Sequence, residues 1–293
     1  MVKEEFNKVN FFIPCMNKDY ILVIIPVLIW SSMGILVRYL SVSGLVAYFF
    51  AALISSIIFA TLLIKEKKLK DFFIKKYLWI PITIGLFGVI NNVSYFYAYQ
   101  LTSIANATFV HYLAPVLVMI FSPLILAEKT KKRMWYSVIL SLIGLFILLD
   151  MKNFNLSTGI FLAFLSAIGY SFGIIFFKKA LKYYSSKEII FSQMFFSTII
   201  LLPFIFYLKP VIAYSDIFPL ITLGVIYQGF AVLLFITALK NLPSQNVSIV
   251  TYLEPIGAVL LALLILKEIP SLTTIIGGAI ILISSYLIIK TDS

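Results

Sequence analysis

Ten apolar runs constrain the fold of this chain more than any other feature. Each run is long enough to cross the hydrocarbon of a bilayer as an α-helix, which takes roughly 20 residues. The runs lie at 20–38, 45–64, 78–99, 104–126, 134–150, 158–178, 188–207, 217–238, 245–266 and 272–290. Charged residues make up 12% of the chain, about half the share found in soluble domains. We therefore predict an all-α integral membrane protein with ten transmembrane helices.

The positive charges orient these helices. With the N-terminus placed inside, nineteen of the 23 Lys and Arg residues fall in inner segments, and only Arg38, Lys152, Lys209 and Lys267 fall outside. Cytoplasmic connections carry such an excess. We expect a multi-pass protein of the cell (plasma) membrane with both termini in the cytoplasm and residues 1–18 as a cytoplasmic N-terminal segment. The net charge of +11 then reflects orientation and contact with membrane lipids, not nucleic-acid binding.

Cysteine and histidine are scarce. The chain holds one cysteine, Cys15, which excludes an internal disulfide, and one histidine, His111. A lone histidine without a cluster of Cys or Asp provides no metal site, and the sequence contains no ATP-binding motif. We expect no metal, no cofactor and a monomer or weak homodimer.

The chain repeats itself at an offset of 140 residues. The stretch Asn106-Ala-Thr-Phe-Val-His-Tyr-Leu-Ala-Pro115 returns as Asn246-Val-Ser-Ile-Val-Thr-Tyr-Leu-Glu-Pro255. Further pairs at this offset are Trp30 with Tyr170, Ser31 with Ser171, and Arg38 with Lys178. We predict two five-helix repeats, 19–150 and 151–293. Because each repeat has an odd number of helices, the two copies are inverted in the membrane. Arg38 and Lys178 then end equivalent helices at opposite faces, where we expect their charges to extend to the membrane surface.

The same motifs recur in the same order in both repeats. The first repeat carries Trp30-Ser-Ser-Met-Gly34, Pro115, Glu128 and Gly144. The second carries Tyr170-Ser-Phe-Gly173, Glu254-Pro255, Glu268 and Gly277-Gly278. This pattern resembles the EamA branch of the drug/metabolite transporter superfamily over nearly the whole chain after Lys18. One departure is Ser284, which stands where the first repeat has Gly144 and leaves the close packing of the last helix open.

The resemblance implies ten helices in two inverted repeats and transport of small metabolites, often export of amino acids. Inverted repeats favour a carrier on physical grounds too, with a substrate site near the midplane where the repeats meet. We predict a secondary transporter that exports small metabolites such as amino acids by alternating access, with protons as the candidate coupling ion. A channel or facilitator without coupling is the alternative. A membrane-embedded enzyme is a third reading, but the chain shows no nucleophile–base pair or phosphate-binding loop.

Pro115 and Pro255 lie near the centres of paired helices. A proline cannot donate to the carbonyl four residues earlier, so it kinks the helix and frees the carbonyls of His111 and Thr251. In hydrocarbon such a carbonyl needs a partner or a wet cavity. We predict hinges at both prolines, with the freed carbonyls either contributing to a binding site or satisfied by a neighbouring Ser or Thr.

Glu254 is the strongest single candidate for a functional residue. A carboxylate at mid-membrane costs about 2.5–3.5 kcal/mol on insertion scales, so it should face a cavity and hold a partner or a proton. Glu254 either binds a substrate ammonium or carries a coupling proton, or it is a structural acid next to the proline. His111, which pairs with Thr251 one turn from Glu254, either shares that proton or is a hydrogen-bonded packing residue.

Other polar and aromatic side chains complete the predicted substrate site. Amides, hydroxyls and rings at the midplane suit a zwitterionic or amphipathic metabolite, and they can equally hold helices together. The predicted set is Trp30, Ser31, Asn91, Asn92, Tyr95, His111, Tyr112, Tyr170, Tyr227, Gln228, Thr251, Tyr252 and Glu254. We expect Gly169 and Gly173 to let helices approach closely rather than to touch substrate. Glu128 and Glu268, at helix ends, act as salt links or gates, or are ordinary solvated ends.

Overall fold

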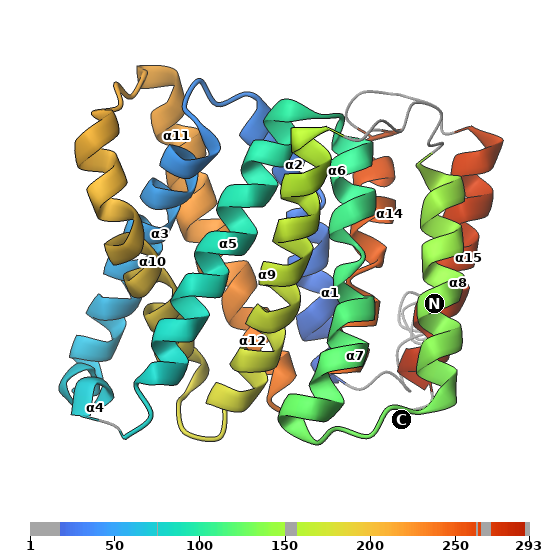
Figure 1. The fold of residues 1–293 in the computed structure, drawn as a ribbon, viewed down its shortest axis with the longest axis horizontal. Coiled ribbons are helices and arrows are strands. Elements are labelled where there is room, and N and C mark those ends of the chain that lie inside the picture. The colour runs from blue at the N-terminus through green and yellow to red at the C-terminus, as the bar shows by residue number, and fades with distance from the viewer. Residues whose placement is uncertain (1–17, 75, 150–156, 262, 265–270, 291–293) are drawn as a thin grey trace, which may run out of the picture.

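The computed structural model describes residues 18–74, 76–149, 157–261, 263–264 and 271–290 (Figure 1). Every regular element within these ranges is helical. The predicted all-α class is therefore confirmed. The predicted N-terminal segment lies outside the described residues except for Lys18.

The helices follow one another with short connections. The first half contains α1 (Lys18–Trp30), α2 (Met33–Arg38), α3 (Gly44–Lys65), α4 (Leu69–Ile74), α5 (Trp79–Leu101), α6 (Ile104–His111), α7 (Ala114–Leu126) and α8 (Lys132–Leu148). The second half contains α9 (Thr158–Ala180), α10 (Ser186–Leu208), α11 (Tyr214–Thr222), the π-helix η2 (Leu223–Ala231), α12 (Val232–Leu239), α13 (Ser244–Val250), α14 (Leu253–Leu261) and α15 (Leu272–Lys290).

Eight stretches of the described residues are long and apolar enough to cross a membrane, and they coincide with eight of the ten predicted runs. Several are built from consecutive short helices, such as α1 with α2 and α6 with α7. The two remaining predicted runs correspond to α8 and to α13 with α14. Helix α8 has 17 residues, which is at the short end for a membrane span, and α14 is described as far as Leu261.

Serine residues begin several helices at the ends of the bundle. The Ser185 hydroxyl accepts from the Glu188 backbone N–H at 3.4 Å, and the Glu188 carboxylate accepts in return from the Ser185 N–H at 2.8 Å. This reciprocal pair satisfies backbone donors that the first turn of α10 would otherwise leave unpaired. Ser103 caps α6 in the same position relative to its helix, accepting from the Asn106 N–H at 3.1 Å. The chain thus starts its apolar helices with polar caps outside the hydrocarbon.

The two repeats run through the molecule in opposite directions. In the view of Figure 1, α1 starts at the lower end of the bundle, whereas its counterpart α9 starts at the upper end. Counterparts pack against each other in two places, α3 with α10 and α8 with α15. Two further interfaces are related by the inversion: α5 packs along α9, and α1 packs along α12. The predicted inverted arrangement therefore fits the observed packing.

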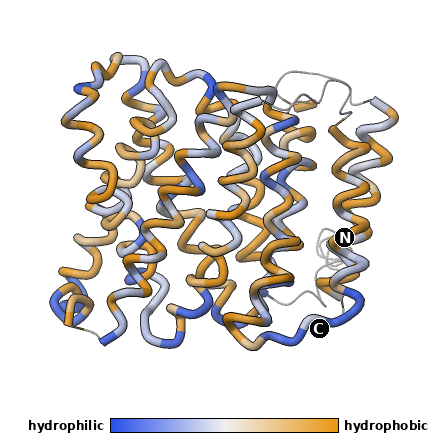
Figure 2. The backbone as a smooth tube through the Cα atoms, viewed as in Figure 1, coloured by the Kyte–Doolittle hydropathy of each residue, from blue (hydrophilic) through white to orange (hydrophobic). Residues whose placement is uncertain are grey.

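Polar residues gather at the two ends of the bundle, and the middle is dominated by hydrophobic residues (Figure 2). The strongly hydrophilic segments are concentrated at the lower end, where α3 leads to α4, α7 leads to α8 and α9 leads to α10. This is the distribution expected of helices that cross a bilayer with polar connections on both sides.

Arg38 and Lys178 make the same contacts in the two repeats. The Arg38 guanidinium donates to the carbonyls of Tyr99, at 3.5 Å, and Thr102, at 3.1 Å, at the end of α5. The Lys178 ammonium donates to the carbonyls of Leu239, at 2.6 Å, and Leu242, at 2.7 Å, at the end of α12.

These four acceptors are themselves related by the offset of 140 residues, so each cation fastens the first helix of its repeat to the end of the third. A cation is well placed there because the last carbonyls of a helix lack partners and carry partial negative charge. Arg38 is exposed and Lys178 is half-buried, so both charges lie at helix ends as the sequence suggested, and there they bind the carbonyls that end α5 and α12.

Helices α8 and α15 form a close pair, which answers the question raised by Ser284. A Cβ added to Gly144 would meet the Gly277 carbonyl oxygen at 2.9 Å, so glycine allows the two backbones to approach. Ser284 is fully buried and donates to the Ser137 carbonyl at 2.6 Å, and its hydroxyl also contacts that of Ser141 at 2.7 Å. The serine keeps the last helix closely packed and adds hydrogen bonds that glycine would lack.

Glu128 is a link between repeats rather than a solvated helix end. Its carboxylate accepts from the Ser244 backbone N–H at 3.1 Å, where α13 begins, and from the Ser122 hydroxyl at 2.7 Å. A carboxylate at that position satisfies unpaired donors of the first turn. Its repeat counterpart, Glu268, lies outside the described residues.

Replacing Lys178 with Met should lower the thermal stability of the purified protein, because the carbonyls that end α12 lose a charged donor. Hydrogen bonds to charged groups contribute about 1.5–3 kcal/mol. Lys182→Met removes an exposed charge four residues later and should leave the unfolding temperature nearly unchanged. The measurement is thermal unfolding in detergent, and equal effects of the two substitutions would contradict the capping role.

Candidate functional site

Both proline-bearing helices are interrupted in the described structure. Helix α6 ends at His111 and α7 begins at Ala114, while α13 ends at Val250 and α14 begins at Leu253. The two breaks occupy equivalent places in the repeats, immediately before Pro115 and Pro255. The kinks predicted from the prolines are therefore present.

The freed carbonyl of Thr251 does not face a cavity as a vacant acceptor. It accepts from the Glu254 backbone N–H at 3.0 Å, a tighter turn that replaces the bond lost at Pro255. The Thr251 hydroxyl is also turned back onto its own helix, where it donates to the Ser248 carbonyl at 2.6 Å. Thr251 therefore belongs to the break itself, because neither of these groups is directed at a ligand.

Tyr112 and Tyr252 hold the two breaks together. Their ring centres are 5.4 Å apart, and the Tyr252 hydroxyl donates to the Tyr112 carbonyl at 2.9 Å. Both side chains are buried in a cluster formed with α8 and α15. Tyr112 and Tyr252, both predicted to bind substrate, thus form the frame of the site and do not line its cavity.

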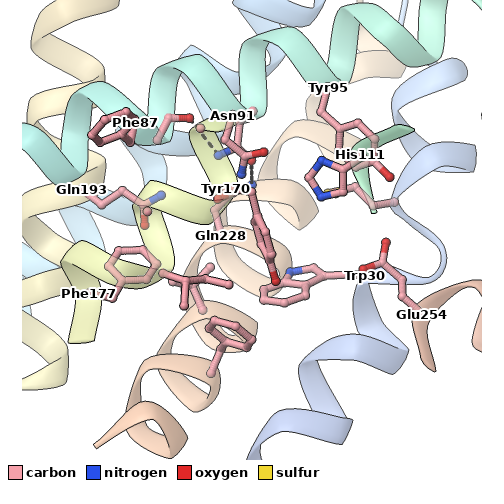
Figure 3. A pocket seen from close by; sticks show the side chains of 18 residues that line it. Trp30, Phe87, Asn91, Tyr95, His111, Tyr170, Phe177, Gln193, Gln228 and Glu254 are labelled. Atoms are coloured by element: carbon pink, nitrogen blue, oxygen red, sulfur yellow. Dashed lines mark hydrogen bonds between the residues drawn. The ribbon is translucent and has the colours of Figure 1, made fainter. Parts of the chain in front are cut away.

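A cavity lies where the two repeats meet, beside both breaks (Figure 3). Helices α1, α2, α5 and α6 of the first repeat border it, together with α9, α10, η2, α12 and α14 of the second. Eight of the thirteen predicted residues line it: Trp30, Asn91, Asn92, Tyr95, His111, Tyr170, Gln228 and Glu254. The structure therefore brings together side chains that are separated by more than two hundred residues in the sequence.

His111 stands at one side of the cavity in an aromatic setting. Its ring stacks on Tyr95 with centres 4.0 Å apart, and the Tyr170 ring meets it edge-on at 5.1 Å. Nδ1 lies 2.6 Å from the Ser166 hydroxyl, which in turn lies 3.2 Å from the Asn91 side-chain oxygen. The Ser166 hydroxyl has one proton to donate, so the tautomer of His111 decides whether Nδ1 donates to this hydroxyl or accepts from it. In either case the ring is fixed in place by this contact.

Glu254 enters the same side of the cavity from the start of α14 (Figure 3). Its side chain is partly buried and interacts with the Tyr112 hydroxyl. Within the described residues it forms no ion pair, and no Lys or Arg lines the cavity. The carboxyl group is therefore surrounded by phenol rings and an imidazole rather than by a counter-charge.

Amides occupy the opposite side. The Gln228 side-chain nitrogen donates to the Asn92 oxygen at 2.8 Å, and the Asn92 nitrogen donates to the Gly88 carbonyl at 3.0 Å. Gln193, from α10, lies beside them and is 5% exposed, with its side-chain oxygen lacking a hydrogen-bond partner. This side is neutral and offers hydrogen-bond acceptors.

Ser31 and Tyr227, also predicted to bind substrate, stabilise the walls instead. The Ser31 hydroxyl lies 2.8 Å from the Glu254 carbonyl and joins α1 to α14. The Tyr227 hydroxyl contacts that of Ser32 at 2.5 Å, and the Tyr227 carbonyl accepts from the Trp30 indole at 3.2 Å. Because Trp30 is held through its indole nitrogen, its ring is left to face the cavity.

Sequence reasoning missed part of the lining. Gln193 carried a usable signal, because it is an amide inside the apolar run 188–207. The aromatic walls Phe87, Phe177 and Phe235 carried none, because a phenylalanine on a membrane helix faces lipid, core or cavity with the same sequence pattern.

The prediction for the two glycines of α9 was right for one and wrong for the other. A Cβ on Gly169 would lie 2.5 Å from the Asn91 backbone nitrogen, so this glycine permits the close packing of α9 on α5. Gly173 lines the cavity, and a Cβ there would have nothing within 4 Å. Gly173 thus keeps space open and makes no close helix contact.

Comparison with known proteins agrees with the geometry. Residues 17–150 and residues 157–290 each match the EamA-like transporter family. The chain belongs to this family. The double match corresponds to the two repeats, and it confirms the family recognised from the motifs.

Curated relatives of this EamA-family chain are transporters by name. An uncharacterized transporter of Archaeoglobus fulgidus is 30% identical over 199 residues, which cover 68% of this chain and 72% of the relative. Another, of Clostridium kluyveri, is 26% identical over 290 residues, 93% of each chain. A solved crystal structure superposes with a TM-score of 0.77 at 17% identity, covering 95% of this chain and all of the other, and shows that the fold is shared. The protein is a membrane transporter of the EamA type.

Gly169→Ala should destabilise the protein, whereas Gly173→Ala should not. The added methyl at 169 must displace the α5 backbone, and such overpacking costs about 1–3 kcal/mol. Thermal unfolding of the two variants side by side in detergent measures the difference. A larger loss at Gly173 than at Gly169 would show that the roles of these glycines have been assigned the wrong way round.

Proposed function

We propose that this EamA-type transporter is a secondary carrier that exports a small amphipathic metabolite by alternating access. The observation that carries the proposal is the cavity at the junction of two inverted repeats, where polar, aromatic and acidic side chains converge. Such a position, near the midplane and between repeats, is where secondary carriers bind substrate. Amino acids and related amphipathic compounds are the first candidates, since amides, a carboxyl group and rings line the cavity.

The breaks supply a means of movement. The helix breaks before Pro115 and Pro255 reach the cavity through His111 and Glu254, and the interruption between α1 and α2 reaches it through Trp30. Chain segments that change direction at such breaks can tilt without disturbing the hydrogen bonds of the helices on either side. We infer that the two repeats rock about these points and expose the cavity to one face at a time.

The charge distribution supports the orientation. We infer a plasma-membrane protein whose termini and Lys-rich connections are cytoplasmic, as the excess of basic residues before α10 favours. A cysteine placed at Lys68 should then be shielded from an impermeant maleimide in intact cells, and one placed at Val211 should react. The reverse labelling pattern would invert the assignment.

We further propose that Glu254, with His111 beside it, exchanges a coupling proton. The carboxyl group lies in a water-poor site without a counter-charge, so a bound proton would relieve the cost of its ionised form. The Tyr112 hydroxyl bonds the carboxyl group, and the phenols of Tyr95 and Tyr99 of α5 and Tyr170 of α9 lie close enough to sense its charge. His111 is the basic side chain among the described residues that line the cavity.

A channel is the competing function, and flux measurements separate the two. The carrier should give saturable uptake of a labelled amino acid or amine into proteoliposomes, and no unitary currents in bilayer recordings. Gly173→Phe should abolish this uptake, because the ring enters open cavity space without a clash at its Cβ.

The matched control is Gly278→Ala, whose added methyl would meet only a Leu148 side-chain carbon at 3.8 Å. This variant should transport normally. Full uptake by a folded Gly173→Phe protein would show that substrate does not pass through the cavity.

Glu254→Gln should remove the response of transport to an imposed pH gradient, because the amide cannot take up or release a proton. Uptake by the unmodified protein and by Glu254→Gln is compared with and without the gradient. Glu128→Gln, the same change outside the cavity, should keep the response. An unaltered pH response in Glu254→Gln would end the coupling hypothesis.

A further inference from the structure

The charge in the cavity lining comes from one acidic side chain. Glu254 is this acidic lining residue, and no Lys or Arg lies in the lining. Arg38 and Lys178, the pair of cations related by the repeat, are held by carbonyls at the ends of α5 and α12. A ligand carboxylate would therefore enter without a cationic partner, and burying an unpaired charge is costly. A ligand cation would meet its partner.

The surroundings of Glu254 suit an ammonium group. Trp30, Tyr95 and Tyr170 line the cavity with it, and the ring of Trp30 is fixed by its bond to the Tyr227 carbonyl at 3.2 Å. Aromatic faces attract cations, and an ammonium bonded to a carboxylate makes a strong, charge-assisted hydrogen bond. Carboxylate and rings together therefore form a site for a positively charged nitrogen.

The opposite side of the cavity carries a hydrogen-bond acceptor that a neutral donor on the ligand could satisfy. Gln193 is 5% exposed, and its side-chain oxygen has no hydrogen-bond partner. Its side chain interacts with the Tyr48 hydroxyl, so the amide has a fixed neighbour on one side and an unused acceptor. Buried acceptors are normally paired, so an unpaired one in a side chain that lines a cavity could turn to a donor on the ligand. A hydroxyl or N–H would fill this role.

Aromatic rings and amides line the space between the two ends (Figure 3). Figure 3 places Glu254 on the side of His111 and Tyr95, and Gln193 on the far side beside Phe87 and Phe177. Phe87 stacks on Phe172 with ring centres 5.0 Å apart, so that wall is held flat. A flat hydrocarbon or aromatic body fits between such walls.

We propose that the cavity binds a small aromatic amine without a carboxylate, with its ammonium on Glu254, its ring between the aromatic walls and a neutral donor on Gln193. This inference rests on the proposed carrier function and narrows its substrate class. Among the candidates proposed above it favours amines over amino acids, because an amino acid brings a negative charge for which the described lining has no cation.

Equilibrium binding to the purified full chain tests the charge preference. The probes are tyramine, tyrosine and hydroxyphenylpropionate, which share a ring and differ in carrying an ammonium, both charges or a carboxylate. Tyramine should bind at least about tenfold more tightly than the other two. Glu254→Gln should weaken tyramine binding about tenfold or more, as expected for loss of a charged hydrogen bond. Tyrosine binding as tightly as tyramine would overturn the proposal, as would failure of tyramine, phenethylamine and tryptamine to bind.

A second comparison tests the amide end. Tyramine has a hydroxyl that phenethylamine lacks, so Gln193→Leu should reduce tyramine affinity and leave phenethylamine affinity nearly unchanged. Equal losses for both amines would exclude Gln193 as the acceptor. Thermal unfolding of each variant shows whether it is folded at the assay temperature.

The binding experiment tests the ligand class and the flux experiment tests the carrier function, so either proposal can fail without the other. Tyramine that binds with this pattern but is not taken up by proteoliposomes would contradict the carrier and leave the ligand class intact. Saturable uptake of tyrosine in preference to tyramine would contradict the ligand class and leave the carrier intact.

Discussion

Every polar group inside a bilayer must find its partner within the protein, because hydrocarbon offers none. This structure meets that requirement at each place where the helices are irregular. The last carbonyls of α5 and α12 receive Arg38 and Lys178, and the break before Pro255 closes with the bond from Glu254 to Thr251. Two groups in the cavity lining are less completely satisfied: the Gln193 side-chain oxygen has no hydrogen-bond partner, and the Glu254 carboxyl has no counter-charge among the described residues. Because both belong to the lining, a bound ligand could supply their partners.

Duplication gives the molecule its frame, and differences between the copies give it a site. The residues common to both breaks, Tyr112 with Tyr252 and Pro115 with Pro255, pack against each other or shape the chain. Where the copies differ, Glu254 replaces Ala114 in the position after the shared Leu, and His111 replaces Thr251. Glu254 and His111 line the cavity, whereas their counterparts Ala114 and Thr251 are not among its lining residues. Two identical repeats would present two equal half-sites. In this protein only the second repeat contributes an acid at this position, because the first has Ala114 there.

Much of the fold could be read from the sequence, because membrane spans depend on length and apolarity and a duplicated chain reveals its own register. The prolines marked the breaks, and polar residues in apolar runs marked Glu254, His111 and the amides of α5. Other features depend on which face of a helix looks inward. Tyr252 and Tyr227 were expected at the substrate, yet their hydroxyls are engaged by Tyr112 and Ser32. Phe87 and Phe177 line the cavity with nothing in the sequence to separate them from the remaining phenylalanines.

The contacts of Arg38 and Lys178 have a mechanical consequence. Each ties the first membrane span of its repeat to the end of the third, through bonds to two main-chain oxygens. The repeats are also bonded to each other, for example from Ser244 to Glu128 and from Ser41 to Asp216. A repeat held together in this way can move as a unit only if contacts between the repeats rearrange, and the cavity lies among those contacts.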